Sequence, residues 1–283
     1  MKFGANTFIW RSPFSTEKDL DLIPKLKIMG FDLIEVAIED PALIDLGILK
    51  EELDSNGMGV VTCGAFGPGR NLSSLDETER KAAKDYLIWM IDAAEYLGSE
   101  VVIGPMYSAV GKARLESGDD RKTEWNYAVD GLKEMCAYAD NKGIKLAFEP
   151  LNRFETDLVN VVDQGLKLIK DVGAKNLGFH LDTFHMHLEE KDSVSAIKKA
   201  GDRVFHFHAC ENDRGVPGTG QVKWEGIFQA LKEINYDGSV VIESFTPEVK
   251  SIARAVCIWR EIAPDQDAIA RDGLSFIKPY LEQ

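Results

Sequence analysis

Four side chains that can bind a metal ion each follow a short apolar run of the chain. They are Glu149 after IKLAF, Asp182 after NLGFHL, His208 after RVFHF and Glu243 after SVVI. The intervals between them are 33, 26 and 35 residues, about the length of one strand and one helix. If the runs are strands of a parallel barrel, the four side chains meet at its carboxyl-terminal rim, where such barrels build active sites.

The chemical character of these four residues predicts a metal site. Three carboxylates and one imidazole are mainly oxygen donors, which favours Mn²⁺, Mg²⁺ or Co²⁺ over a zinc site rich in Cys or His. A single buried acid is more often paired with an Arg or a Lys. Four candidate ligands in the same register favour the metal.

All five histidines of the chain lie within residues 180–208. Side chains alternate along a strand, so His180 shares a face with Asp182, and His206 shares one with His208. Each lies about 6–7 Å deeper along its strand, which is too deep for the same metal. We expect both to fill the barrel or to support the ligands, with internal partners for their nitrogens.

The other two, His185 and His187, fall beyond the end of the predicted strand. We expect them in a loop near the rim, where contact with a substrate is possible. His187 has no assigned role.

The elements that must position these residues alternate along the chain. Short β-branched runs predict strands, and the segments between them have the periodicity of amphipathic helices, several of which stop at a glycine. The predicted strands are 2–8, 32–38, 59–65, 100–105, 144–150, 176–182, 203–209 and 239–245, and the predicted helices are 16–30, 41–57, 76–98, 124–143, 157–173, 192–201 and 224–238.

This alternation predicts an α/β fold, a (βα)₈ TIM barrel. A doubly wound open sheet is the alternative, because strand count alone does not prove closure. We expect a single domain, 1–283, since no linker rich in Pro, Gly or Ser divides the chain. The stretch 263–283 is too long for one closing helix, so an extra C-terminal helix is expected.

Composition excludes several classes of partner. A net charge of -14 opposes binding to nucleic acid or to an anionic membrane surface. The four cysteines show no CxxC pairing, which argues against a disulfide framework or a zinc knuckle. The N-terminus does not read as a signal peptide, and no apolar run reaches about 18 residues, so we expect a cytoplasmic protein.

Several motifs resemble those of a known family. The stretches are EPLNRFET (149–156), HLDTFHMHLEE (180–190), FHFHACENDRGVPGTGQVKW (205–224) and YDGSVVIESF (236–245). They are similar to the ketose 3-epimerases, the D-tagatose, D-allulose and L-ribulose 3-epimerase group of sugar isomerase and epimerase barrels. The resemblance covers nearly the whole chain and is strongest over 144–260.

The resemblance implies roles for individual residues. It makes Glu149, Asp182, His208 and Glu243 the metal ligands, the same four that strand register selects. Glu155, His185 and Arg214 match positions that hydrogen-bond substrate hydroxyls. It also implies Mn²⁺ as the cofactor, with Co²⁺ or Mg²⁺ possible, and a homodimer or homotetramer.

The implied reaction inverts C3 of a free ketohexose or ketopentose. The metal polarises the C2 carbonyl, one of Glu149 and Glu243 removes the C3 proton to give a cis-enediolate, and the other returns a proton to the opposite face. The implied substrate pairs are D-fructose and D-allulose, D-tagatose and D-sorbose, and L-ribulose and L-xylulose. A phosphorylated sugar is less expected, because no glycine-rich phosphate loop lies near the last two strands.

The sequence departs from the family pattern near the substrate. Asn6 stands where many relatives carry an aromatic residue close to the far end of the sugar. The residues that could supply an apolar wall are Trp10, Phe14, Cys63, Met106, Tyr107 and Phe245. These differences bear on substrate preference and leave the chemistry unchanged.

Three other functions remain open at this point. The nearest is another enzyme on the same barrel: an inosose dehydratase, a hydroxypyruvate isomerase or a 3-keto-sugar epimerase. The second is an endonuclease of the related DNA-repair barrels, which the negative charge opposes. The third is a barrel that binds sugar without catalysis.

Overall fold

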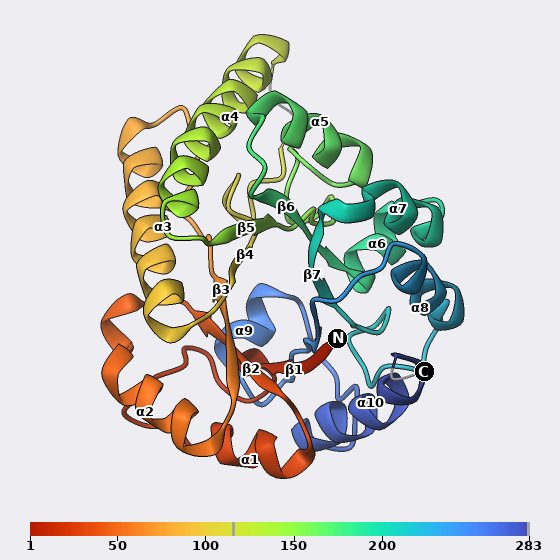
Figure 1. The fold of residues 1–283 in the computed structure, drawn as a ribbon. Helices are drawn as coiled ribbons and strands as arrows, with labels where there is room; N and C mark the ends of the chain where they lie inside the picture. The colour runs from red at the N-terminus through yellow and green to blue at the C-terminus, as the bar shows by residue number, and fades with distance from the viewer. Residues whose placement is uncertain (115–116, 282–283) are drawn as a thin grey trace.

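A closed barrel of parallel strands forms the centre of this computed structural model, which describes residues 1–114 and 117–281. Figure 1 shows the strands ringed by helices, in the order of the chain. The (βα)₈ prediction is confirmed and the open-sheet alternative is wrong. Residues 282–283 of the predicted domain lie outside the described part. The strands are β1 Lys2–Asn6, β2 Leu33–Ile38, β3 Gly59–Gly64, β4 Val101–Gly104, β5 Lys145–Phe148, β6 Leu177–Asp182, β7 Val204–His208 and β8 Ser239–Ile242.

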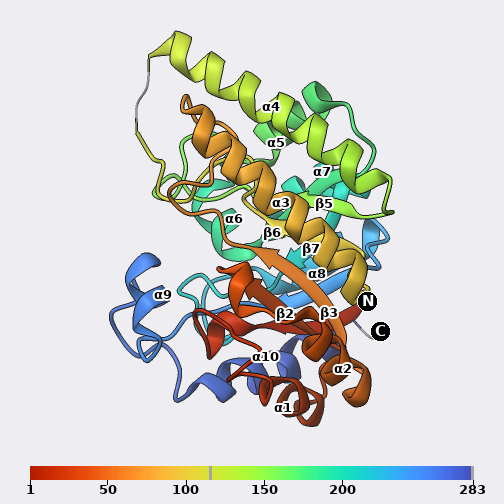
Figure 2. The ribbon, with the colours of Figure 1, turned by 90° about the vertical axis from the view of Figure 1, so that its left-hand side faces the viewer.

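Helices surround the barrel (Figure 1), and one of them, α9, lies across one end of it (Figure 2). They are α1 Leu22–Met29, α2 Leu46–Asn56, α3 Glu77–Leu97, α4 Gly118–Asp140, α5 Val162–Val172, α6 Thr183–Glu189, α7 Ser193–Ala200, α8 Trp224–Glu233, α9 Lys250–Ala255 and α10 Gln266–Leu281, with 3-10 turns η1 Thr7–Ile9, η2 Pro41–Leu43 and η3 Gly201–Arg203. The last of them, α10, packs against α8, β1 and β8, which confirms the extra C-terminal helix. In Figure 2, α9 and the N-terminus lie at opposite ends of the barrel.

Alternation of side chains along each strand divides the core into two layers. In β2, Ile34, Val36 and Ile38 pack outward against the helices. Leu33 and Ala37 belong to the apolar cluster inside the barrel. Glu35 lies midway between those two residues and therefore points inward as well, although its side chain is a carboxylate.

Two element ends differ from the predicted ones for local reasons. The first strand stops at Asn6, whose Oδ1 accepts the N–H of Phe8 at 2.8 Å and caps the turn that follows. Asp182 caps α6 in the same way, because its Oδ1 accepts the N–H of Phe184 at 2.7 Å. The predicted loop that holds His185 and His187 is therefore wrong, because both residues lie in this short helix.

The strands β6 and β7 approach each other closely at a glycine. A Cβ atom on Gly178 would lie 2.5 Å from the carbonyl oxygen of Arg203, so no larger residue fits without a shift of backbone. The register of the two strands changes between Phe179 and His180, after which His180 pairs with His206 and Asp182 with His208. This pairing brings the histidines of both strands side by side.

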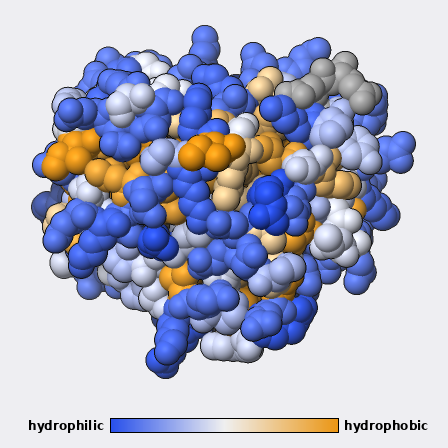
Figure 3. Space-filling view, turned by 90° about the horizontal axis from the view of Figure 1, so that it is seen from below, coloured by the Kyte–Doolittle hydropathy of each residue, from blue (hydrophilic) through white to orange (hydrophobic). Residues whose placement is uncertain are grey.

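The surface mixes hydrophilic and hydrophobic areas on the face seen from below in Figure 1 (Figure 3). Ile28 of α1 is 87% exposed and Ile48 of α2 is 49% exposed. Among the described residues, no helix is both long enough and apolar enough to cross a membrane.

Candidate active site

The four predicted ligands come from four consecutive strand ends. Asp182 and His208 are the last residues of β6 and β7, while Glu149 and Glu243 directly follow β5 and β8. Each is at most 7% exposed. Oxygen, nitrogen or sulfur atoms of Asp182, His208, Glu243 and the neighbouring Cys210 lie within 4.8 Å of one another. The structure thus brings the predicted set together at one end of the barrel.

Glu149 joins this cluster through Asp182 and His185, with ligand atoms within 4.8 Å of one another. Its Oε1 lies 3.6 Å from His185 Nε2, and its Oε2 lies 3.7 Å from His180 Nδ1. Burial and the negative charges of Glu243 and Asp182 raise the pKa of Glu149 well above its usual range. Negative charge is therefore in excess around this carboxyl.

Arg214 places its guanidinium among these carboxylates. Its Nη1 donates to Asp182 Oδ2 at 2.6 Å and to Glu243 Oε2 at 3.1 Å. The guanidinium also lies over the rings of Phe184 and Phe245, 4.1 and 5.0 Å from their centroids. The side chain predicted to bind substrate hydroxyls thus provides a cation where a metal would bring two positive charges.

Glu35, inside β2, orients His208. The Nε2 of His208 lies 2.7 Å from Glu35 Oε1, and its Nδ1 points to the rim, 3.5 Å from Glu243 Oε2. Burial lowers the pKa of His208, but the charges of Glu35 and Glu243 outweigh it and raise this pKa well above the usual range. A carboxylate on the far nitrogen is the usual support of a metal-bound histidine.

Opposite forces act on the pKa of Glu243. Burial alone would raise it, but His208 and Arg214 outweigh burial, so the pKa lies below its usual range. Glu243 is therefore the ionised partner of Glu149 in this arrangement. Two carboxyls whose environments push their pKa values apart are typical of acid and base pairs in enzymes.

His185 is held in one tautomer. The backbone N–H of Asn152 donates to its Nδ1 at 3.0 Å, which leaves the proton on Nε2, facing Glu149. Burial and the charge of Arg214 lower the pKa of His185 well below the usual range, so the ring is neutral. Glu155 accepts from Asn152 Nδ2 at 2.7 Å on the same side of the site.

The remaining predicted contact residues lie around this cluster, on the inner side of the barrel. Asn6 Nδ2 donates to Glu35 Oε1 at 2.6 Å and to Glu243 Oε1 at 3.3 Å, so this side chain lies beneath the rim. Cys63 and Phe245 belong to the apolar cluster inside the barrel. Burial and the charge of Glu35 raise the pKa of the Cys63 thiol well above its usual range.

The four other residues considered for an apolar wall, Trp10, Phe14, Met106 and Tyr107, are packed in the outer core between strands and helices. The polar atoms of two of them are already paired within the protein. Trp10 Nε1 donates to Asp267 in α10, and the hydroxyl of Tyr107 donates to the carbonyl of Val159.

Two members of the site carried weaker signals in the sequence. Glu35 is an acid within an otherwise apolar strand. Its place among the inward-facing residues of that strand is the signal in the sequence that could have identified it. Cys210 lies two residues beyond His208, and burial and the charge of Asp182 raise the pKa of its thiol well above the usual range. Its Sγ accepts from Arg214 Nη1 at 3.0 Å, so Cys210 belongs to the same buried group as the predicted ligands.

The predicted ligands fit a divalent cation. Within the described residues, Glu149 Oε1 and His208 Nδ1 are buried without a hydrogen-bond partner. Such unpaired buried atoms are costly unless an ion or a water occupies the space beside them. A divalent cation would also relieve the repulsion that raises the pKa of Glu149. Glu149, Asp182, His208 and Glu243 would hold it.

Comparison with known proteins gives the family. Residues 23–280 match the xylose isomerase-like TIM barrel model, so the chain belongs to that family.

Particular relatives sharpen the assignment. A probable ketose 3-epimerase of Synechocystis sp. is 36% identical over 98% of this chain and 96% of its own length. D-psicose 3-epimerase of Agrobacterium fabrum is 33% identical over 98% of both chains. A crystal structure of D-allulose 3-epimerase from Methylomonas sp. has a TM-score of 0.93 at 31% identity, covering 99% of this chain and 98% of that one. The resemblance to ketose 3-epimerases is confirmed, and with it membership of the isomerase class of enzymes.

Replacing Glu35 with Gln should weaken Mn²⁺ binding by about 10- to 100-fold, because the charge that orients and polarises His208 is lost. Isothermal titration of the metal-free protein with Mn²⁺ measures this. The matched control is Glu39→Gln, since Glu39 lies just beyond the same strand and its carboxylate accepts a hydrogen bond from the Ser12 hydroxyl. An unchanged dissociation constant in folded Glu35→Gln protein would exclude the orienting role.

Proposed function

We propose that the protein is a metal-dependent ketose 3-epimerase that inverts C3 of a free ketose. The observation that carries the proposal is the placement of Glu149 and Glu243, buried carboxylates from β5 and β8 that both border the cluster of Asp182 and His208. Inversion at one carbon requires two acid or base groups on opposite sides of it. The named 3-epimerase relatives support the choice of reaction.

The cation that suits the four proposed ligands is Mn²⁺, with Co²⁺ or Mg²⁺ as alternatives, because the donors are mostly carboxylate oxygens. Bound there, it would polarise the C2 carbonyl of a ketose and make the C3 proton more acidic. Displacement from Asp182 and Glu243 would free the Arg214 guanidinium for a substrate hydroxyl.

Glu149 and Glu243 are the proposed proton-transfer groups. One carboxylate removes the proton from C3, and the other returns a proton to the opposite face of the resulting cis-enediolate. Which of them acts first depends on which epimer is bound. Both are nearly excluded from solvent, which keeps bulk water away from the reacting carbon.

The proposed substrate contacts surround this pair. His185 offers its Nε2–H, Arg214 offers its guanidinium, and Glu155 accepts hydroxyl protons. Phe245 and Cys63 provide apolar surface on the inner side, and Asn6 supports Glu243 from below. The cytoplasmic location, the single-domain organisation and the homodimer or homotetramer stay predictions.

Incubation of the Mn²⁺ protein with D-fructose, D-tagatose and L-ribulose in D₂O should produce the C3 epimer of at least one ketose, with deuterium at C3. Nuclear magnetic resonance measures both the epimer and the label. Neither epimer nor label with any of the three would contradict the proposal. Dehydration, aldose formation or inversion at C4 would instead indicate another enzyme of the same barrel.

Replacing Glu243 with Gln should lower kcat by about 10²- to 10⁴-fold, the usual contribution of a general acid or base, while sugar binding survives. Steady-state kinetics and a sugar titration measure the two effects. Glu248→Gln is the matched control, because Glu248 is exposed in the segment after the same strand. Normal turnover in Glu243→Gln would be fatal to its assigned role.

A further inference from the structure

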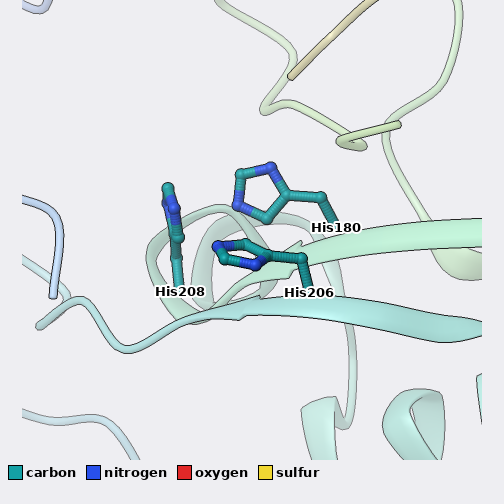
Figure 4. Close-up of side chains that lie close together, drawn as sticks. All are labelled: His180, His206 and His208. Atoms are coloured by element: carbon teal, nitrogen blue, oxygen red, sulfur yellow. The ribbon is translucent and has the colours of Figure 1, made fainter. Parts of the chain in front are cut away.

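Three histidine side chains meet inside the barrel, directly below the rim. His180 of β6 and His206 and His208 of β7, the histidine trio, have ring centroids 4.0 to 5.2 Å apart. Figure 4 shows one nitrogen of His180 and one of His206 directed toward the His208 ring. One nitrogen from each ring lies within 4.8 Å of the other two.

The trio is sealed from solvent and incompletely paired. All three residues are at most 1% exposed. In the part of the chain that the structure describes, both nitrogens of His180, Nδ1 of His206 and Nδ1 of His208 lack a hydrogen-bond partner. The expectation of internal partners therefore fails for His180, whereas His206 Nε2 has a carboxylate oxygen of Glu35 beside it. An unpaired buried polar group is costly unless an ion or a water lies beside it, so the unpaired nitrogens point to a bound ion or water.

A carboxylate completes the group. Glu35 Oε2 lies 2.7 Å from His206 Nε2, and Oε1 lies 2.7 Å from His208 Nε2. Glu35 is fully buried, and its Oε2 has no hydrogen bond of good geometry to any described residue. Three imidazoles and one carboxylate are thus gathered from strands β2, β6 and β7.

This donor set differs in kind from the one at the rim. Imidazole-rich sites favour Zn²⁺ and similar borderline cations, whereas the rim carboxylates suit Mn²⁺ or Mg²⁺. Zinc held tetrahedrally at about 2 Å from each nitrogen requires nitrogens about 3.3 Å apart. The nitrogens of the trio, within 4.8 Å of one another, would have to move closer together to reach that spacing.

We infer that the histidine trio and Glu35 form a second divalent-cation site, selective for Zn²⁺ and distinct from the rim site. The two sites share the His208 ring, whose Nε2 faces the interior and whose Nδ1 faces the rim. The inference is independent of the reaction catalysed at the rim.

Native mass spectrometry of metal-free protein titrated with Zn²⁺ tests the site by counting ions. Wild-type protein should bind two zinc ions per chain, and His180→Phe and His206→Phe should each bind one. The matched control His187→Ala should still bind two, because His187 is exposed in α6. One ion in the wild type, or two in a folded trio variant, overturns the inference.

If the trio variants do not fold, anomalous diffraction at the zinc edge from wild-type crystals tests whether zinc occupies the histidine trio. The expected result is an anomalous peak between His180, His206 and His208. Density without anomalous signal at that position means that water fills the space and overturns the inference.

Discussion

Repulsion among buried carboxylates is the constraint around which this end of the barrel is built. Glu35, Glu149, Asp182 and Glu243 all lie inside the mouth of the barrel, at most 7% exposed. Removing charges from water is costly unless opposite charges and hydrogen bonds compensate for the loss. The unpaired Glu149 Oε1 and His208 Nδ1 leave a place for a cation that supplies such compensation.

Two cationic side chains of the protein provide part of the compensation for these buried negative charges. His208 lies between Glu35 below and Glu243 above, and Arg214 spans Asp182 and Glu243. The loop that carries Arg214 is held in place by hydrogen bonds to a buried acid, Glu211.

Glu211 holds that loop through hydrogen bonds to three N–H groups. Glu211 accepts the N–H groups of Gly218 and Val222 and the indole N–H of Trp224. Arg214 has a φ of 64°, in the left-handed region that non-glycine residues adopt only where surrounding contacts hold them. The fold therefore fixes the arginine at the cost of local strain, which is common beside functional sites.

The sequence was sufficient for the barrel and for the rim cluster because both depend on regular periodicity. A polar residue closing each of four apolar runs is a one-dimensional signal, and parallel strands convert it into proximity. Glu35 was missed because its contacts cross the barrel to His206 and His208, residues 171 and 173 positions away. Which side chains meet across a closed barrel depends on the strand register. The periodicity of a single segment gives no information about that register.

The histidines show both what the sequence predicts about the site and what it does not. Strand alternation correctly separated His208 at the rim from His180 and His206 below it. The expectation of hydrogen-bond partners required knowledge of the opposing walls, where apolar side chains and Glu35 lie. The helix that contains His185 and His187 is hard to predict from the sequence because it is only seven residues long and directly follows Asp182, whose side chain caps it.

The central claim is that the rim carboxylates and His208 hold a metal ion that displaces Arg214. A crystal structure of Mn²⁺-loaded protein, with anomalous data, tests it most directly. The account predicts one manganese peak bonded to Glu149, Asp182, His208 Nδ1 and Glu243, with the Arg214 guanidinium moved off Asp182. Absence of manganese from this cluster, with Arg214 still bonded to Asp182 and Glu243, would contradict it.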